Sequence, residues 1–92
     1  MISRINGVLL TRDTDRVEIE TAGGVVFEIE VPLTVLQRLP STGATLQLRT
    51  LQVVTEKSIS LYGFIDAHER TLFQRLLNAS GVGAKVALAM MS

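Results

Sequence analysis

The chain lacks cysteine and tryptophan entirely, and its 92 residues include only one histidine. Without cysteine it can form no disulfide framework, no thiolate metal site and no cysteine nucleophile. The single histidine, His68, falls in the first turn of an expected helix, where a surface position is the simplest interpretation. No serine stands in a recognisable nucleophile setting. We therefore expect no enzymatic activity, no catalytic residue, no metal ion and no cofactor.

Long apolar runs are also missing. The segment Met1–Gly7 has no apolar core of the signal-peptide kind, and no run approaches the length of a membrane span. We expect a cytoplasmic protein with no membrane contact. Aromatic residues are few, and they occupy positions that look like core or strand packing: Phe27, Tyr62, Phe64 and Phe73. An OB-fold that stacks single-stranded bases on its rings is therefore a weaker alternative.

A surplus of charge of either sign is absent as well, because nine basic and nine acidic residues cancel. Hydrophobic residues make up 47% and charged residues 20% of the chain, which is the balance of one small globular unit. A nucleic-acid-binding protein usually carries a basic surplus. If this chain binds DNA, its affinity must come from local geometry and from repetition across subunits.

Five short strands are predicted within residues 1–65, separated by turn signals at close spacing. Their approximate ranges are 2–10, 17–20, 27–31, 46–53 and 59–62. Pro32 ends the third strand, and residues 34–39 can form a short helical link before the fourth. This order matches an OB-fold barrel. The sequence therefore predicts a mainly β fold with C-terminal helices, in which residues 1–65 form the barrel domain.

Two irregularities are expected inside these strands. Asn6-Gly7 indicates a bulge or a sharp bend in the first strand. In the fourth strand the inward parity changes from Leu48 to Leu51, which a bulge near Thr50 would explain. The outward positions of the second and third strands are acidic and disfavour phosphate binding there; they are Glu18, Glu20, Glu28 and Glu30.

Residues 66–92 predict two helices. Asp66 and Glu69 have the spacing of a capping box, which places the first helix start at Asp66. The helix extends to about Ala79, with one expected buried face made of Leu72, Phe73, Leu76 and Leu77. The second helix begins near Gly83 and is still apolar at the last residue, so we expect a truncated helical domain whose packing partner lies elsewhere.

The turn between these helices is the strongest candidate for a functional site. Gly81 and Gly83 flank Val82, which predicts a hairpin with Val82 between the helices. The amides that open the second helix have no intrahelical partner and can donate to a phosphate. The candidate DNA-binding residues are Ser80, Gly81, Val82, Gly83, Ala84 and Lys85. An ordinary corner between two helices has the same glycine pattern, so that structural interpretation remains open.

Three segments together resemble the bacterial RuvA family, the Holliday-junction-recognition subunit of the branch-migration machinery. They are Leu61-Tyr62-Gly63-Phe64, Glu69-Arg70-Thr71-Leu72-Phe73, and Gly81-Val82-Gly83-x-Lys85-x-Ala87-Leu88-Ala89, and the opening Met1-Ile2-x-Arg4-Ile5-x-Gly7 fits as well. The resemblance covers the whole chain but only about the first half of a typical member. It implies an OB barrel followed, in residues 66–92, by the first of two helix-hairpin-helix motifs in an incomplete helical domain.

The resemblance also implies a function. Members of the family are non-catalytic tetramers that bind four-way DNA junctions in recombination and repair, and a C-terminal domain engages an ATP-driven motor subunit. An acidic pin between the last two barrel strands lies near the crossover, and its position here is occupied by Glu56. The next residue, often acidic in the family, is Lys57. An alternative is a protein-interaction or assembly module that does not bind DNA.

Overall fold

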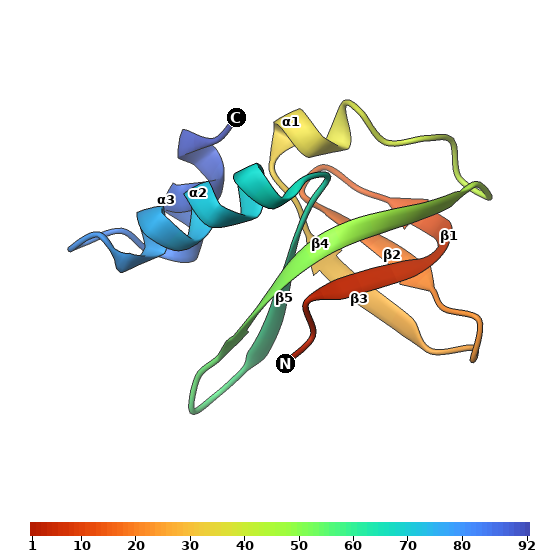
Figure 1. The fold of residues 1–92 in the computed structure, drawn as a ribbon, viewed down its shortest axis with the longest axis horizontal. Helices are drawn as coiled ribbons and strands as arrows, with labels where there is room; N and C mark the ends of the chain where they lie inside the picture. The colour runs from red at the N-terminus through yellow and green to blue at the C-terminus, as the bar shows by residue number, and fades with distance from the viewer.

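The computed structural model describes residues 1–92 and shows a closed five-stranded barrel with helices after it (Figure 1). The strands are β1 (Arg4–Arg12), β2 (Arg16–Glu20), β3 (Val26–Glu30), β4 (Thr45–Val54) and β5 (Ile59–Phe64). The helices are α1 (Leu33–Leu36), α2 (Ala67–Asn78) and α3 (Ala84–Met90). The predicted five strands, the short helix between the third and fourth, and the two C-terminal helices are thus confirmed.

The barrel has the order β1-β2-β3-β5-β4, which is consistent with an OB-fold. β1 pairs antiparallel with both β2 and β4, and β4 pairs antiparallel with β5. Closure depends on a short parallel contact in which Glu30 of β3 lies opposite Tyr62 of β5. The barrel interior contains fully buried aliphatic side chains from four strands, among them Leu9, Ile19, Ile29 and Leu48.

The predicted bulge at Thr50 is wrong. β4 keeps one unbroken register with β5, in which Thr50 lies opposite Gly63. Thr50 is buried, and its hydroxyl donates to the carbonyl oxygen of Ile2 at 2.8 Å. Both parities of the strand are apolar because both faces are covered. Leu51 and its cross-strand partner Tyr62 face outward toward α2, whose Phe73 ring lies 4.9 Å from that of Tyr62.

The irregularity in β1 also lies elsewhere than expected. Gly7 pairs in regular register with Leu46, and the register shifts only between Leu9 and Thr11. Close packing against the neighbouring strand, and not a bulge, requires a glycine at position 7. A Cβ atom there would lie 2.3 Å from the backbone oxygen of Glu20, so no larger residue fits unless the strands separate.

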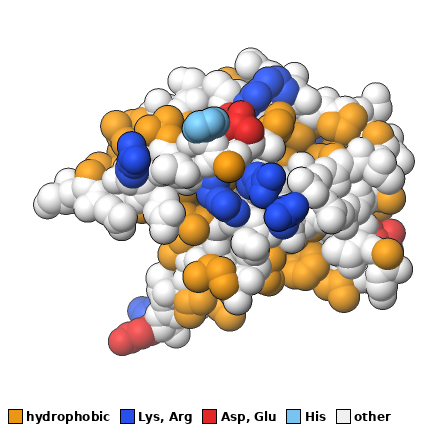
Figure 2. All heavy atoms as spheres, viewed as in Figure 1, with side chains coloured by type: hydrophobic (Ala, Val, Ile, Leu, Met, Phe, Trp, Pro, Cys, Tyr) orange, Lys and Arg blue, Asp and Glu red, His pale blue; other side chains and the backbone are white.

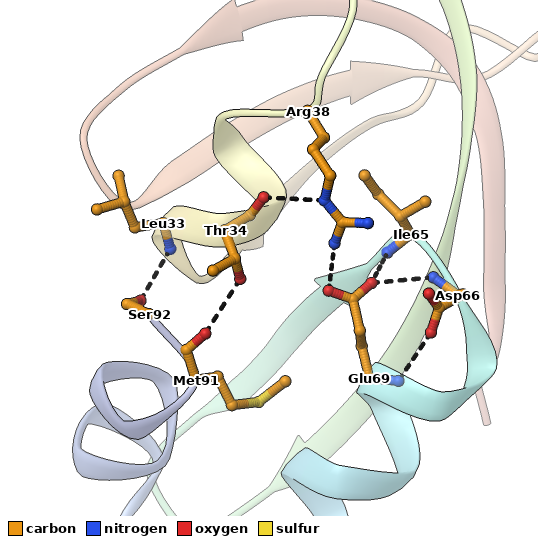
Figure 3. Close-up of polar contacts among 8 residues, drawn as sticks. All are labelled: Leu33, Thr34, Arg38, Ile65, Asp66, Glu69, Met91 and Ser92. Atoms are coloured by element: carbon orange, nitrogen blue, oxygen red, sulfur yellow. Dashed lines mark hydrogen bonds and ion pairs between the residues drawn. The ribbon is translucent and has the colours of Figure 1, made fainter.

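The start of α2 is the capping box that the sequence predicts (Figure 3). The Glu69 amide donates to Asp66 Oδ1 at 2.9 Å, and the Asp66 amide donates to Glu69 Oε1 at 3.2 Å. The same carboxylate accepts from the Ile65 amide and forms an ion pair with Arg38, in the turn after α1. One glutamate therefore joins the barrel exit, α2 and the turn that follows α1.

The two C-terminal helices pack only partly as expected. Phe73 is fully buried, but Leu72 is 48% exposed, so the predicted inward position of Leu72 is wrong. The end of α3 is held to α1 (Figure 3): Ser92 Oγ accepts from the Leu33 amide, and Thr34 Oγ1 donates to the Met91 carbonyl. None of the three helices has the length and hydropathy of a membrane-crossing helix.

Candidate nucleic-acid interface

The turn between α2 and α3 contains one conformation that requires glycine. Gly81 has a φ of 77°, in the left-handed region that a side chain disfavours. The amide of the next residue, Val82, donates to the Ala79 carbonyl, and the Val82 side chain is half-buried against the core, as the sequence predicts. The turn is therefore closed by local bonds and anchored by one apolar side chain.

The N-terminal amides of α3 face an uncrowded surface. Gly83 is the N-cap residue, and no side chain caps the helix. The first helical bond runs from the Ala87 amide to the Gly83 carbonyl at 2.9 Å. The amides of Ala84, Lys85 and Val86 precede that bond and have no intrahelical acceptor. A Cβ atom added at Gly83 would meet nothing within 4 Å, so a ligand can approach this backbone closely.

Lys85 lies near acidic residues that the sequence did not place beside it. Together with Asp15, Glu30 and Ser92 it lines a shallow hollow of about 270 Å³ between the barrel and α3. No ion pair joins Lys85 to either carboxylate within 4.0 Å. The two negative charges nevertheless weaken the positive potential that Lys85 contributes to the turn.

Glu56 lies at the exposed tip of the β4–β5 hairpin. Thr55 organises this tip, because its amide donates to the Ser58 carbonyl at 2.8 Å and its hydroxyl oxygen accepts from the amides of Lys57 and Ser58. The tip carries one acidic and one basic side chain side by side. Both are free of ion pairs.

The structure keeps the two predicted sites apart. Figure 1 shows the β4–β5 hairpin and the α2–α3 turn as separate projections on the same side of the barrel. Figure 2 shows that the surface between them is hollowed. Ser80 through Lys85 form one contiguous site on the helical projection, and Glu56 belongs to the other projection. A ligand that contacts both must extend across the hollow.

Sequence reasoning missed three arginines that gather where α2 meets the barrel: Arg4, Arg49 and Arg70. They lie on β1, β4 and α2, so no motif or spacing along the chain joins them. Only the strand register, which places Arg4 opposite Arg49, brings the first two together. The only feature of the sequence that pointed to Arg4 and Arg49 was a basic residue at an outward strand position. Such residues are too common to identify a binding site.

Two residues of the barrel strands have shifted titration. A hydrogen bond from Arg16 to Asp15, together with the charges of Asp15 and Glu28, raises the pKa of the Arg16 guanidinium above its ordinary value. Burial raises the pKa of the Tyr62 hydroxyl, and the nearby charge of Glu30 acts in the same direction. Neither group lies in the candidate site. The carboxylates that contribute to the two shifts, Asp15, Glu28 and Glu30, belong to an acidic side of the barrel that is unsuited to phosphates.

Comparison with known proteins points to one family. The model of the RuvA N terminal domain matches residues 1–63. The whole chain is 50% identical to the Holliday junction branch migration complex subunit RuvA of Gemmatimonas aurantiaca and 42% identical to that of Burkholderia cenocepacia. In each case the 92 matched residues cover 47% of the relative, so the chain spans about half the length of these proteins. The barrel and its sequence together show that this chain belongs to the RuvA N-terminal domain family.

Proposed function

We propose that the chain takes part in structure-selective, non-catalytic binding of four-way DNA junctions during recombination and repair. The observation that carries this proposal is a match, over all 92 residues of this chain, to the first half of proteins named as Holliday junction branch migration complex subunits. The open amides at the start of α3 support it, because they supply a way to hold DNA phosphates.

In this proposal α2, the turn and α3 act as a helix-hairpin-helix motif. The backbone amides of Gly81, Gly83 and Ala84 donate to phosphate oxygens of a duplex arm, whereas the Val82 amide is already bonded to the Ala79 carbonyl. Ser80, Val82 and Lys85 complete the contact surface. Because these groups read phosphate and not base edges, binding depends on the shape of the DNA and carries little sequence information. The division into a barrel domain, 1–65, and a partial helical domain, 66–92, is part of the proposal.

Glu56 acts at the other projection as the acidic pin. Its carboxylate repels strand phosphates near the crossover and helps to keep the junction open. Four copies around a junction place four such tips near the axis. Lys57 offsets part of this repulsion, so this pin is weaker than one made of two carboxylates. Engagement of an ATP-driven motor subunit is assigned to the other half of the family's length and not to these residues.

The sharpest test of the hairpin contact is Gly83→Asp. An aspartate at the N-cap accepts from one free amide of α3 and stabilises the helix, yet it places a negative charge where the phosphate binds. We expect an unchanged or higher unfolding midpoint together with at least tenfold weaker junction binding in a fluorescence titration. Gly23→Asp is the matched control, since Gly23 also has open space around it and lies in the distant β2–β3 turn.

Two results decide this test. Junction binding that falls equally in the Gly23→Asp and Gly83→Asp proteins reflects net charge alone and rejects the hairpin site.

A companion variant, Lys85→Ala, should weaken binding to junctions of different base sequence by the same factor, because a phosphate contact reads no bases. Losses that depend on base sequence would instead indicate base readout.

An assembly module without DNA binding is the second candidate. It is favoured by apolar side chains that remain exposed on α2 and α3: Leu72 at 48%, Val86 at 52% and Met90 at 58%. Such a surface is suited to packing against another protein segment. Self-association of this chain with no detectable binding to junction DNA, measured by sedimentation with and without the junction, would support this candidate over the first.

A further inference from the structure

A cluster of three arginines is organised around one backbone carbonyl. The Ser3 oxygen accepts a hydrogen bond from Arg70 Nη1 at 2.8 Å and another from the Thr50 amide at 3.0 Å. Arg4 follows Ser3 in the chain, and Arg49 precedes Thr50. Arg4 and Arg49 are also direct cross-strand partners on β1 and β4, and their side chains therefore emerge on the same face.

This arrangement carries an electrostatic cost within the protein. Like charges placed directly opposite each other on antiparallel strands are destabilising. No carboxylate forms an ion pair with any of the three arginines within 4.0 Å. Two other arginines do have counter-charges, since Arg16 pairs with two carboxylates and Arg38 pairs with Glu69, whereas Arg12 and Arg75 form no ion pair. The cluster therefore lacks its counter-charge.

The side chains of the cluster are accessible. Arg4 is exposed, and Arg49 and Arg70 are half-buried. In Figure 2, Lys and Arg side chains gather over the junction of the barrel and α2, next to the inner end of the hollow between the two projections. Arg70 Nη1 is fixed by Ser3, while its remaining guanidinium N–H groups can donate to another acceptor. A guanidinium suits the oxygens of a phosphate.

The position of the cluster matches a DNA strand held at the α2–α3 turn. From Arg70 to the end of α2 at Asn78 the helix rises about 12 Å at about 1.5 Å per residue. A strand of B-DNA rises about 3.4 Å per nucleotide, so this length corresponds to about three or four nucleotides. One strand can therefore meet the turn with one phosphate and the arginines with others.

We propose that Arg4, Arg49 and Arg70 form a second phosphate-binding site, which holds the DNA backbone where the barrel meets α2. The inference rests on the proposed DNA-binding function and extends it. The hairpin amides bind one end of a short stretch of backbone, and the arginines bind the other end. In a chain of zero net charge, three of the nine basic residues are thereby placed together on the surface that faces DNA.

The test uses the variant pair Arg4→Gln and Arg49→Gln, singly and combined, and leaves Arg70 in place because it also bonds to Ser3. Binding of a labelled duplex and a labelled four-way junction is measured between 50 and 200 mM salt. Each lost phosphate contact should make the slope of log affinity against log salt shallower by about 0.9. For the double variant, the loss of affinity across this range should be about tenfold smaller than for the parent.

A thermal unfolding scan supplies an independent readout. Removing either of two opposed like charges should leave the unfolding midpoint unchanged or raise it. Weaker DNA binding by a protein that is at least as stable therefore cannot be attributed to misfolding. Arg16→Gln is the matched control, because it removes the same charge from a position that is already neutralised by Asp15 and Glu28, and it should leave the salt slope unchanged.

Three outcomes would overturn the inference, and they are distinguishable. If the parent and the double variant bind DNA with the same affinity and salt slope, the arginines do not bind phosphate, while the hairpin proposal still holds. If Arg16→Gln loses as much DNA affinity as the double variant, the effect is due to net charge alone. If the parent protein binds neither duplex nor junction at low salt, both the proposed function and the arginine site are wrong.

Discussion

Tyr62 connects three parts of the molecule through a single side chain. It lies opposite Glu30 where β3 meets β5, and opposite Leu51 in the β4–β5 pair. Its ring packs against Phe73 of α2 with the ring centroids 4.9 Å apart. Burial raises the pKa of its hydroxyl, since a tyrosinate there would lose hydration and face the charge of Glu30.

This shift predicts a loss of stability at alkaline pH. The native state keeps the Tyr62 proton to a higher pH than the unfolded chain, so the free energy of unfolding falls as the pH rises above about 10. Below that pH the contribution is fully present. Urea unfolding between pH 8 and about 11 should show this fall in the parent and a smaller fall in Tyr62→Phe.

Tyr62 is the only tyrosine, so ultraviolet absorbance follows its ionisation directly. The midpoint should lie higher in the native protein than in urea. Equal midpoints in the two states, or an identical alkaline loss in the parent and in Tyr62→Phe, would contradict this assignment.

The sequence predicted that both glycines of the α2–α3 turn matter for its structure, but it did not predict that each does so for a different reason. Both were expected to use glycine's conformational freedom, but only Gly81 has a positive φ. Gly83 has extended backbone angles that any residue can adopt, and its distinguishing property is the open space around it. Composition cannot separate these two reasons, because the backbone angles depend on how the two helices pack.

At the element scale, Glu69 has more partners than an N-cap motif alone requires. Its carboxylate accepts from the amides of Ile65 and Asp66, and it also pairs with Arg38. The Asp66 carboxylate accepts only from the Glu69 amide. The capping box was readable from the sequence because its spacing is local. The link to Arg38 was not, because 31 residues separate the two side chains.

These contacts predict unequal costs for two truncations. Asp66→Ala should destabilise the protein by about 0.5–2 kcal/mol, the usual cost of losing an N-cap side chain. Glu69→Ala should cost more, because it leaves two amides without an acceptor and one guanidinium without a counter-charge. His68→Ala is the control within the same turn, and urea unfolding should show little change for it. Equal costs for the Asp66 and Glu69 variants would mean that the contacts of Glu69 beyond the box contribute nothing.

The strands show where pattern reading fails for a physical reason. The change of inward parity from Leu48 to Leu51 was interpreted as a bulge near Thr50, since one face of a barrel strand is normally solvated. Here α2 covers the outer face of β4 and β5, so both parities can be apolar without any break in register. The covering helix follows the strand by more than ten residues, and its docking position was not contained in the strand pattern itself.

At the scale of the whole molecule, charge is separated by surface even though the total is zero. Carboxylates occupy the outer positions of β2 and β3, where Arg16 neutralises part of their charge. Arginines without carboxylate partners occupy the region where α2 meets β1 and β4. The acidic positions of β2 and β3 were predictable from strand alternation, but the arginine region was not, because it depends on which strands and helix become neighbours.

In the proposed function, several copies of this chain hold one junction through weak phosphate contacts. A single hairpin with a few cations should bind only on the order of 10⁻⁴ to 10⁻⁶ M, and linkage among copies supplies the rest of the affinity. Native mass spectrometry of the chain titrated onto a four-way junction and onto a linear duplex of the same sequence measures copies bound and preference together. The account predicts a preference for the junction only in complexes that contain several copies. Tight, nanomolar binding of a single copy, or multi-copy complexes that form equally on linear duplex, would contradict it.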